Sequence, residues 1–300
     1  MIIWPESPKN DTRFCNAAFY LIFTVMKKKI TLYFFWALTL FLGCSKDAEN
    51  NDPSSNGVNK SANLLATGAS ANDLLANTNY SNLLIEIGYV SGFRPTAEAI
   101  ATFETFLRAR TFKESVEFTY KELSSPNQES LTNEEIAEME SENRTAYNTG
   151  NTMALYIYFA DAPSENDDKS EGLVTLGAVY RNTSMVIYEA TIRELVGNSV
   201  TISVADVEAA TLNHEFGHLL GLVNLGSDPV NPDHEDTEVD ETQGEIGNNH
   251  CNVEGCLMRA ELQFGGSLAK MMRSNVSKGL AAIPELDAEC ILDLQSNGGR

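Results

Sequence analysis

The feature that most constrains this chain is a pair of histidines that lie one helical turn apart in an apolar segment. His214 and His218 are four positions apart, so on a helix both imidazoles project from the same face. Phe216, Leu219 and Leu220 lie between and after them, and would bury the opposite face. The segment is therefore predicted to be a buried helix that presents two ring nitrogens on one side.

Two ring nitrogens on one helix face suit a tetrahedral zinc ion. Glu215 lies beside the pair, where its carboxylate could hold a metal-bound water and take its proton without being a ligand. The chain has only four histidines, and all of them lie between residues 214 and 250. Histidines with unrelated structural roles would not concentrate in this way, and a buried pair needs partners. We therefore predict a metal site rather than two structural histidines packed in the core.

The same segment resembles the motif of the metzincin metallopeptidases, which reads His-Glu-x-x-His-x-x-Gly-x-x-His and is followed by a Met-turn beneath the zinc. Residues 214–221 match its first eight positions, and Gly221 would allow the sharp, left-handed helix end that returns the chain toward the metal. Cys256-Leu257-Met258 resembles the Cys-x-Met of the Met-turn. The resemblance implies a Zn²⁺-dependent endopeptidase in which Glu215 is catalytic and Met258 packs under the metal.

The third ligand is the point at which this sequence departs from the motif. Asn224 occupies the position of the third histidine, and a neutral amide is a poor zinc ligand. His234 is the favoured replacement, because a loop could return it to the metal. His250 is the alternative, since it stands before the Met-turn segment as the third histidine of archaemetzincins does. A carboxylate from Asp233 or Asp236 is a further alternative.

Three cysteines lie in the region that follows the motif: Cys251, Cys256 and Cys290. The spacing of the first two resembles that near the Met-turn of archaemetzincins. A disulfide between Cys251 and Cys256 is expected in an oxidising compartment. Cys290 would then be a buried free thiol, or would pair in place of one of the two.

The residues before the motif alternate between short apolar runs and segments of helical spacing. Their order predicts an α+β fold with an α/β-like N-terminal subdomain: a mixed, mostly parallel twisted sheet with helices packed on it and a long active-site helix. Periodicity fades after residue 222, so a small irregular C-terminal subdomain is expected. The expected strands are residues 83–90, 116–120, 154–160, 175–180 and 185–190, and the expected helices begin near residues 95, 132 and 203, with short ones near 266–274 and 285–294.

The N-terminal region has the pattern of an export signal. Lys27–Lys29 form a basic segment, an apolar run follows over residues 30–43, and Cys44 comes directly after it. The end of this run resembles the lipobox of bacterial lipoproteins, which implies that Cys44 carries lipid. The predicted organisation is a signal region over 1–43 (an extension over 1–25 ahead of the true start, and a lipoprotein signal peptide over 26–43), the lipidated Cys44 with a flexible tether over 44–80, and a catalytic domain over 81–300 with its active-site cleft between 81–222 and 223–300.

Charge restricts the partners of this chain. Its formal net charge is −21, from 42 acidic and 21 basic residues. Phosphate binding needs clustered cations, so a nucleic-acid partner is excluded. The expected partners are a protein or peptide substrate and the membrane, which the N-terminal lipid would reach, and we expect a monomer. The expected location is the outer membrane or cell surface, as an exported and membrane-anchored lipoprotein.

These features predict hydrolysis of peptide bonds by a metal-bound water that Glu215 activates. A strand near residues 175–181 could bind the substrate backbone by strand addition. The alternative is a surface lipoprotein that binds ligands and holds a structural or inactive zinc ion, and Glu215 argues against it because a structural site needs no base. A gluzincin with a downstream glutamate as ligand is a further alternative, which the helix stop at Gly221 disfavours.

Overall fold

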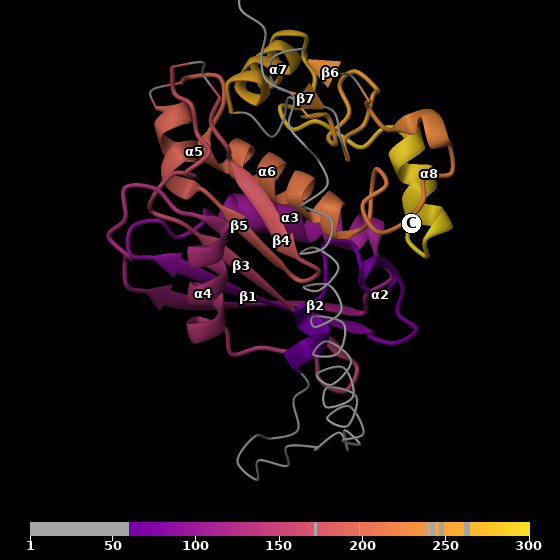
Figure 1. Cartoon of the computed structure of the whole chain (residues 1–300). Helices are drawn as coiled ribbons and strands as arrows, with labels where there is room; N and C mark the ends of the chain where they lie inside the picture. Colours follow the sequence, from indigo (N-terminus) through magenta and orange to yellow (C-terminus); the bar gives the residue numbers. More distant parts are fainter. Residues whose placement is uncertain are drawn as a thin grey trace, which may run out of the picture. The chain divides into compact units, whose positions relative to one another are not determined.

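The computed structural model describes most of the chain after residue 59 (Figure 1). The predicted signal region, Cys44 and the first part of the predicted tether lie outside the described residues. The described ranges are 60–170, 173–197, 199–237, 239–240, 244–245, 249–260 and 265–300. The helices are η1 (Lys60–Asn63), α2 (Ala71–Leu75), α3 (Ala97–Arg110), α4 (Asn133–Asn143), α5 (Glu189–Val196), α6 (Val204–Leu219), η2 (Pro232–His234), α7 (Gly265–Ser277) and α8 (Ala288–Ser296). The strands are β1 (Asn82–Val90), β2 (Ser115–Leu123), β3 (Thr152–Phe159), β4 (Gly177–Arg181), β5 (Ser184–Ile187), β6 (Val239–Asp240) and β7 (Gly244–Glu245).

One five-stranded sheet in the order β2-β1-β3-β5-β4 forms the centre of the fold. β2, β1, β3 and β5 are parallel, and β4 pairs antiparallel with β5 at the edge. β3 is buried along almost its whole length, as its continuous apolar sequence predicts for a central strand of a covered sheet. The predicted fold class, a mixed and mostly parallel sheet with helices packed on it, is confirmed.

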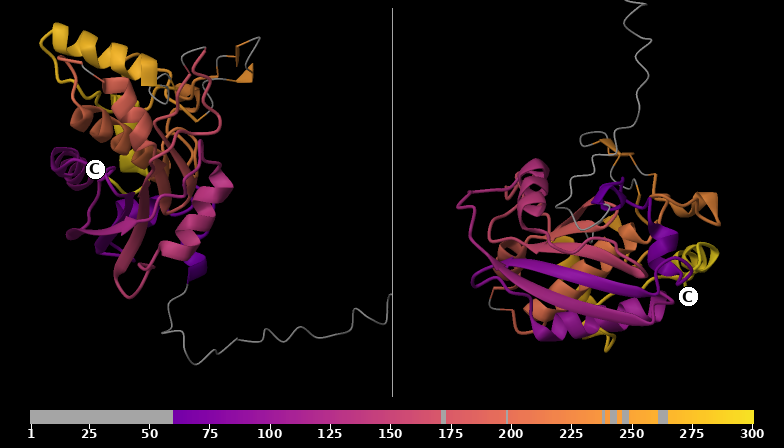
Figure 2. Two further views of the ribbon diagram at one scale, coloured as in Figure 1. Left: turned by 90° about the vertical axis from the view of Figure 1, so that its left-hand side faces the viewer. Right: turned by 90° about the horizontal axis from the view of Figure 1, so that it is seen from below.

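The two faces of the sheet carry different helices. Leu155 and Ile157 of β3 belong to the core that includes α3 and α6 residues, whereas Tyr156 and Tyr158 face a second core that includes Ile136 of α4. Successive side chains of a strand point to opposite faces, which divides β3 between the two cores. Figure 2 shows the sheet between α4 on one side and α3 and α6 on the other.

α6 is the longest helix described, with 16 residues, and its two ends are well defined. Ser203 and Asp206 form a reciprocal capping box at its start, as the sequence predicts. At its end Gly221 has φ +80°. The Gly221 amide donates to the His218 carbonyl at 3.1 Å, and the Leu222 amide donates to the Gly217 carbonyl at 3.2 Å. This is the hydrogen-bond pattern of a Schellman motif, which needs a left-handed residue at this position.

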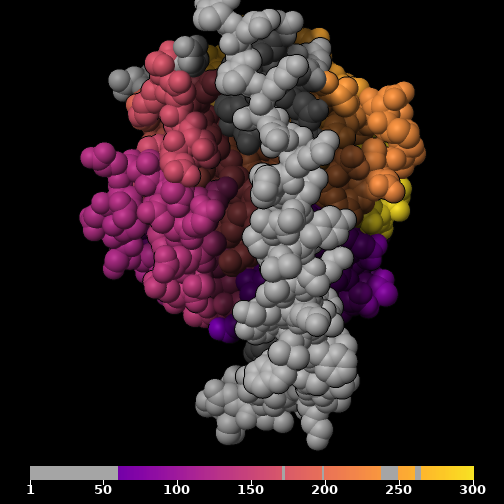
Figure 3. Space-filling model, viewed as in Figure 1, coloured from indigo at the N-terminus to yellow at the C-terminus, as the bar shows by residue number. Residues whose placement is uncertain are grey.

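Residues 60–80, predicted to be the end of the tether, belong to the folded unit. They contain η1 and α2, and both Leu74 and Leu75 are fully buried. The side-chain amide of Asn63 donates to the Ala154 carbonyl of β3 at 3.0 Å. The Asn72 side chain donates to the Asn297 carbonyl at 2.8 Å, so this segment lies beside the C-terminal residues (Figure 3). Its mostly polar composition led to the prediction of a tether, although a few of its apolar side chains are buried in the core.

Two elements differ from the sequence-based expectation. The strand expected over 185–190 ends at Ile187, and α5 begins at Glu189. Glu189 and Arg193 pair one turn apart, and Ile192 and Val196 are buried, which favours a helix over a longer strand. The helix expected to begin near residue 132 is α4, which ends at Asn143, where Arg144 takes an extended conformation. Within the described part of the chain, every helix is too short or too polar to cross a bilayer.

Candidate metal centre

Three buried histidines converge beneath the end of α6. His214 and His218 come from α6, and His250 comes from the loop that returns to it. Their ring centroids lie 5.0 Å apart for His214–His218, 5.4 Å for His214–His250 and 5.0 Å for His218–His250. Each ring offers a nitrogen within 4.8 Å of the nitrogens of the other two. One small cation can contact all three, so we call this set the histidine cluster.

The protonation state of the histidine cluster suits a cation. Nδ1 of His214 lies 2.7 Å from the Leu257 carbonyl. A carbonyl only accepts, so Nδ1 carries the proton and the lone pair of Nε2 is left facing away from that bond. That Nε2 atom is buried without a hydrogen-bond partner, and a buried polar atom of this kind calls for a ligand. Burial, and then the neighbouring His250, lower the pKa of His214 to about 3.

His218 behaves in the same way. Burial, together with the charges that His214 and His250 would carry, lowers the pKa of His218 well below its usual range. All these effects favour neutral imidazoles, which is the form that binds metals. The site therefore fits a divalent ion such as zinc.

Glu215 lies next to the first of these histidines on α6. Its side chain is only 3% exposed, and burial raises the pKa of Glu215 to about 8. A carboxyl group in this environment can both accept and return a proton near neutral pH. Glu215 thus lies on the helix that carries two of the three histidines, directly after His214 in the sequence.

Met258 packs against α6 from below, as the Met-turn resemblance implies. It is fully buried, and its Sδ atom would lie 2.3 Å from a Cβ added to Gly217. Gly217 therefore leaves the space that Met258 fills. The adjacent Leu257 supplies the carbonyl that orients His214. The segment before α7 thus supports the metal ligands of α6 by direct contact.

His234, the favoured third ligand, is not part of the histidine cluster. Its ring is buried elsewhere, with Nδ1 2.8 Å from Asp293 Oδ2 and Nε2 3.1 Å from Cys251 Sγ. His250 takes the place expected of His234. Both histidines lie in the long segment after α6. Sequence spacing alone does not show which of the two side chains points toward His214 and His218. Asn224 donates to Glu235 at 3.1 Å and does not belong to the cluster.

The donor atoms around His234 form a second candidate metal site, which we call the thiol cluster: His234, Cys251, Cys256 and Cys290. His234 Nε2 lies 3.6 Å from Cys290 Sγ, and Cys256 Sγ lies 3.6 Å from Cys290 Sγ. Donors of one tetrahedral zinc ion with bonds of about 2.3 Å to sulfur lie about 3.5–3.8 Å apart. Donor atoms of His234, Cys251, Cys290 and Asp287 all lie within 4.8 Å of one another, and Cys256 adjoins this set through its contact with Cys290. These residues together can hold one ion.

The three cysteines of the thiol cluster are free in the structure. The disulfide expected between Cys251 and Cys256 is therefore not formed, and both sulfurs face Cys290 instead. Hydrogen bonds from the Cys251 and Cys290 thiols hold the pKa of the Cys256 thiol well below its ordinary range. Thiolate is the form of cysteine that binds metals.

Two aspartates form hydrogen bonds with residues of the thiol cluster. Asp293 of α8 is buried and accepts from His234 Nδ1 at 2.8 Å and from the Val230 amide at 2.7 Å. A carboxylate behind a histidine is the usual outer partner of a metal ligand, because it fixes the ring and its tautomer. Asp287 accepts from Cys251 Sγ at 2.9 Å, and its carboxylate lies within 4.8 Å of the donor atoms of His234, Cys251 and Cys290. Sequence reasoning missed these two aspartates and the role of Cys290; the only available signal was three cysteines and a histidine in one short region.

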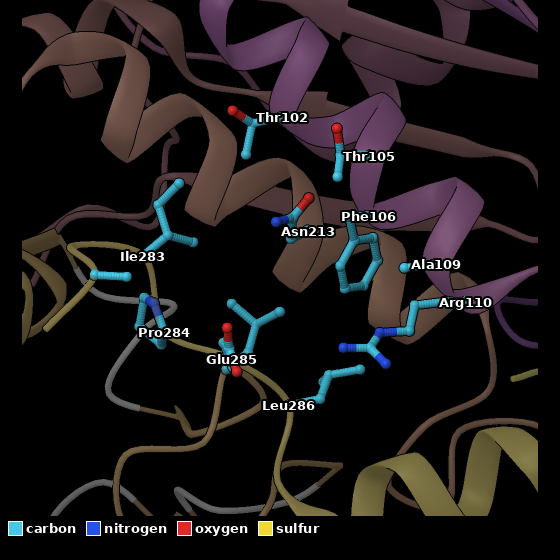
Figure 4. Close-up of a pocket in the computed structure, with 12 residues that line it drawn as sticks. Thr102, Thr105, Phe106, Ala109, Arg110, Asn213, Ile283, Pro284, Glu285 and Leu286 are labelled. Atoms are coloured by element: carbon cyan, nitrogen blue, oxygen red, sulfur yellow. The ribbon is translucent and has the colours of Figure 1, made fainter.

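A pocket of about 250 Å³ lies behind α6, on the side of α3 (Figure 4). Asn213 of α6, Phe106 and Arg110 of α3, and Leu286 of the C-terminal segment line it. Leu257, whose carbonyl orients His214, also contributes to the lining. The pocket therefore adjoins residues that support α6 and orient His214.

Known structures include chains that are similar to this one. No protein-family model and no curated protein matches the sequence. The crystal structure of an archaemetzincin from Methanopyrus kandleri is similar to this chain, with a TM-score of 0.44 and 15% sequence identity, over 72% of this chain and 96% of that chain. A likeness of this extent carries no argument about function, which depends on the geometry of the two clusters.

Proposed function

We propose that this protein is a zinc-dependent endopeptidase whose metal ligands are His214, His218 and His250, with Glu215 as the general base. The observation that carries the proposal is the convergence of three buried imidazoles, together with the buried carboxyl group of Glu215, which follows His214 on α6. Three protein ligands leave the fourth position of a tetrahedral ion open for water or substrate, which distinguishes a catalytic zinc site from a structural one.

Each residue of the proposed site has a separate role in the reaction. A bound zinc ion would supply a Lewis acid that polarises the scissile carbonyl and lowers the pKa of water toward about 7. Glu215 takes the proton of the attacking water and returns it to the leaving amine. The Leu257 carbonyl keeps the proton of His214 on Nδ1, and Met258 keeps the ligand helix in place from below.

The edge strand β4 is our candidate for the substrate-binding strand. It pairs with β5 on one side and is the last strand in the sheet order. It also packs on α6, which carries the proposed ligands (Figure 1). An extended peptide that adds to a sheet edge forms main-chain hydrogen bonds with little sequence requirement. This arrangement favours an unfolded or loop segment of a protein as the substrate.

We also propose that the thiol cluster holds a second zinc ion with a structural role. Its four protein donors would fill a tetrahedral shell and leave no position for a substrate. His234, Cys251 and Cys290 come from three separate segments, so an ion would join these segments in a region with little regular secondary structure. Small domains of this kind depend on a metal for their stability.

The export signal and the lipid on Cys44 remain proposals that depend on the sequence alone. Lys27–Lys29, the apolar run over 30–43 and Cys44 support them. Expression of the full chain in a Gram-negative host with radiolabelled palmitate tests this directly. We expect label in the membrane fraction that is lost in Cys44→Ala, and label that persists in Cys44→Ala would contradict the lipidation site.

The decisive test of the enzyme is zinc content and casein hydrolysis of the protein and of Glu215→Ala. The unsubstituted protein should bind zinc and hydrolyse casein. Glu215→Ala should keep the same zinc content and lose hydrolysis by about 100-fold or more. Exposed Glu104, in a surface pair with Arg108, provides the control Glu104→Ala, which should retain full activity. Bound zinc without hydrolysis of any protein substrate would overturn the peptidase and favour a binding module.

A further inference from the structure

Gly177 is the first residue of β4 and lies directly against the proposed catalytic residue. A Cβ built on Gly177 would stand 2.7 Å from Cγ and 3.0 Å from Cδ of Glu215, and 2.9 Å from Cγ2 of Thr211. Carbon atoms in ordinary contact lie about 3.5–4.0 Å apart. Any side chain at position 177 would therefore overlap the stem of Glu215.

The need for glycine here comes from space and not from backbone conformation. Gly177 does not have a positive φ, so other residues could adopt its backbone geometry. Its backbone is also held in place: Gly177 pairs with Ile187 of β5, and the preceding carbonyl, of Leu176, accepts from the Tyr188 amide at 2.9 Å. The strand cannot withdraw from α6 without breaking this pairing.

Of the two side chains that face Gly177, Glu215 is the one that can move. Thr211 lies one turn earlier on α6, and its hydroxyl donates to the Val207 carbonyl at 2.9 Å. Its β-branched side chain has few rotamers available in a helix. The Glu215 side chain has no such branch, so crowding at position 177 would displace its carboxyl group. A displacement of about 1 Å at a catalytic group can reduce the rate on the order of 100-fold.

We propose that Gly177 is a positioning residue for Glu215: the space left by its missing side chain receives the Glu215 stem and directs the carboxyl group toward the histidine cluster. This inference rests on the proposed peptidase function for its effect on catalysis. The contact between the two residues does not depend on that function. β4 thus has two tasks, since the strand that offers an edge to substrate also sets the place of the base.

A double-mutant cycle on thermal stability tests the contact without any measurement of activity. The four proteins are the unsubstituted chain, Gly177→Ala, Glu215→Ala and the double variant. Gly177→Ala should lower Tm, and this decrease should be at least halved in the Glu215→Ala background, where Cγ and Cδ are absent. An equal decrease in both backgrounds would overturn the proposal. If Gly177→Ala does not fold, the double variant must still fold; failure of both would also overturn it.

Kinetics of casein-peptide hydrolysis test the positioning role. Gly177→Ala should keep its zinc content and KM within about twofold, with kcat lower by about 10- to 100-fold. Gly265→Ala is the matched control, because the three atoms nearest to its Cβ would be apolar side-chain ends, of Leu195, Leu176 and Val174, at 2.9–3.0 Å. It should keep kcat. An unchanged kcat in Gly177→Ala, or an equal loss in Gly265→Ala, would overturn the role, whereas absence of hydrolysis by the unsubstituted protein would instead contradict the peptidase.

Discussion

His250 and Cys251 are neighbours in the chain, yet their side chains enter different clusters. His250 lies with His214 and His218, while Cys251 lies 3.1 Å from His234 Nε2. The backbone between them is extended and paired: the His250 carbonyl accepts from the Asp236 amide at 2.8 Å, and the Cys251 amide donates to the Met258 carbonyl at 2.7 Å. A shift of the backbone at one residue would therefore move the other, so the two clusters are mechanically connected.

The first prediction follows from this connection. Cys290→Ser should remove one equivalent of zinc, because a serine hydroxyl is a poor replacement for thiolate. Loss of a metal is among the few changes that cost about 4 kcal/mol or more, so Tm should fall by about 10 °C or more. Hydrolysis should fall as well, although Cys290 does not belong to the histidine cluster. Metal analysis, thermal unfolding and casein hydrolysis on one preparation check all three effects.

Leu292→Ala on the same helix is the control for Cys290→Ser, because Leu292 is 46% exposed. It should change neither zinc content nor activity. A Cys290→Ser protein that retains both zinc ions and its full Tm would show that the thiol cluster holds no structural ion.

The second prediction separates the two histidines that sequence left as alternatives. His250→Ala should lose the ion of the histidine cluster and all hydrolysis, and His234→Ala should lose the ion of the thiol cluster. Co²⁺ substitution distinguishes them, because cobalt bound to thiolate absorbs strongly in the near ultraviolet and cobalt bound only to imidazole does not. The thiolate band should persist in His250→Ala and vanish in His234→Ala. The reverse pattern would restore His234 as the third catalytic ligand.

Much of the site was predictable, and the remainder was not, for a physical reason. Helical periodicity places His214, Glu215 and His218 together, because neighbours on a helix are fixed by local geometry. The choice between His234 and His250 depends on which way a loop of irregular conformation turns, and no local rule decides this. Asn249 has φ +61° just before His250, a backbone turn that only the folded loop reveals.

The same distinction applies to the fold. β1 and β3 were predicted from mainly apolar runs over residues 83–90 and 154–160, because a covered strand must be apolar. β2 was predicted from the alternation of apolar and polar residues over 116–120. α5 was missed since its sequence is short and its first residue, Glu189, is charged yet buried. Residues 60–80 were read as a tether because polar residues outnumber the leucines that anchor α2.

The third prediction concerns the pH dependence of stability. Glu189 is fully buried; burial, and then the adjacent Glu208, raise the pKa of Glu189 to about 9. The unfolded chain has a Glu pKa near 4.5, so the folded state binds this proton more tightly. The stabilisation of the folded state that comes from this proton is complete below about pH 4.5 and is lost as pH rises toward about 9. Stability should therefore fall across that range, as measured by urea unfolding at about pH 5, 7 and 9.

Glu189→Gln should flatten this decline, since an amide does not ionise. Glu104→Gln, which alters only the exposed pair with Arg108, should run parallel to the unsubstituted protein. Parallel curves for all three proteins would show that Glu189 does not titrate in this range.

The fourth prediction concerns the end of α6. Gly221→Ala should destabilise the protein by about 1–2 kcal/mol from the left-handed backbone alone. It should cost more in total, because its Cβ would lie 2.8 Å from Ala71 Cβ. Gly150→Ala measures the cost of the left-handed backbone conformation alone, since Gly150 has φ +56° and open space around it. Chemical denaturation of both variants gives the two decreases in the free energy of unfolding. Equal decreases would show that the contact with Ala71 adds no cost.

The order of the cluster residues along the chain decides when the two proposed zinc sites become complete. The His234–Cys290 contact of the thiol cluster joins residues 56 positions apart, and His250 enters its own cluster only through the segment that this contact secures. A chain emerging from the ribosome can complete the five-stranded sheet while both proposed sites still lack a donor residue. Zinc is therefore expected to be captured after synthesis has passed Cys290, wherever the finished chain then folds.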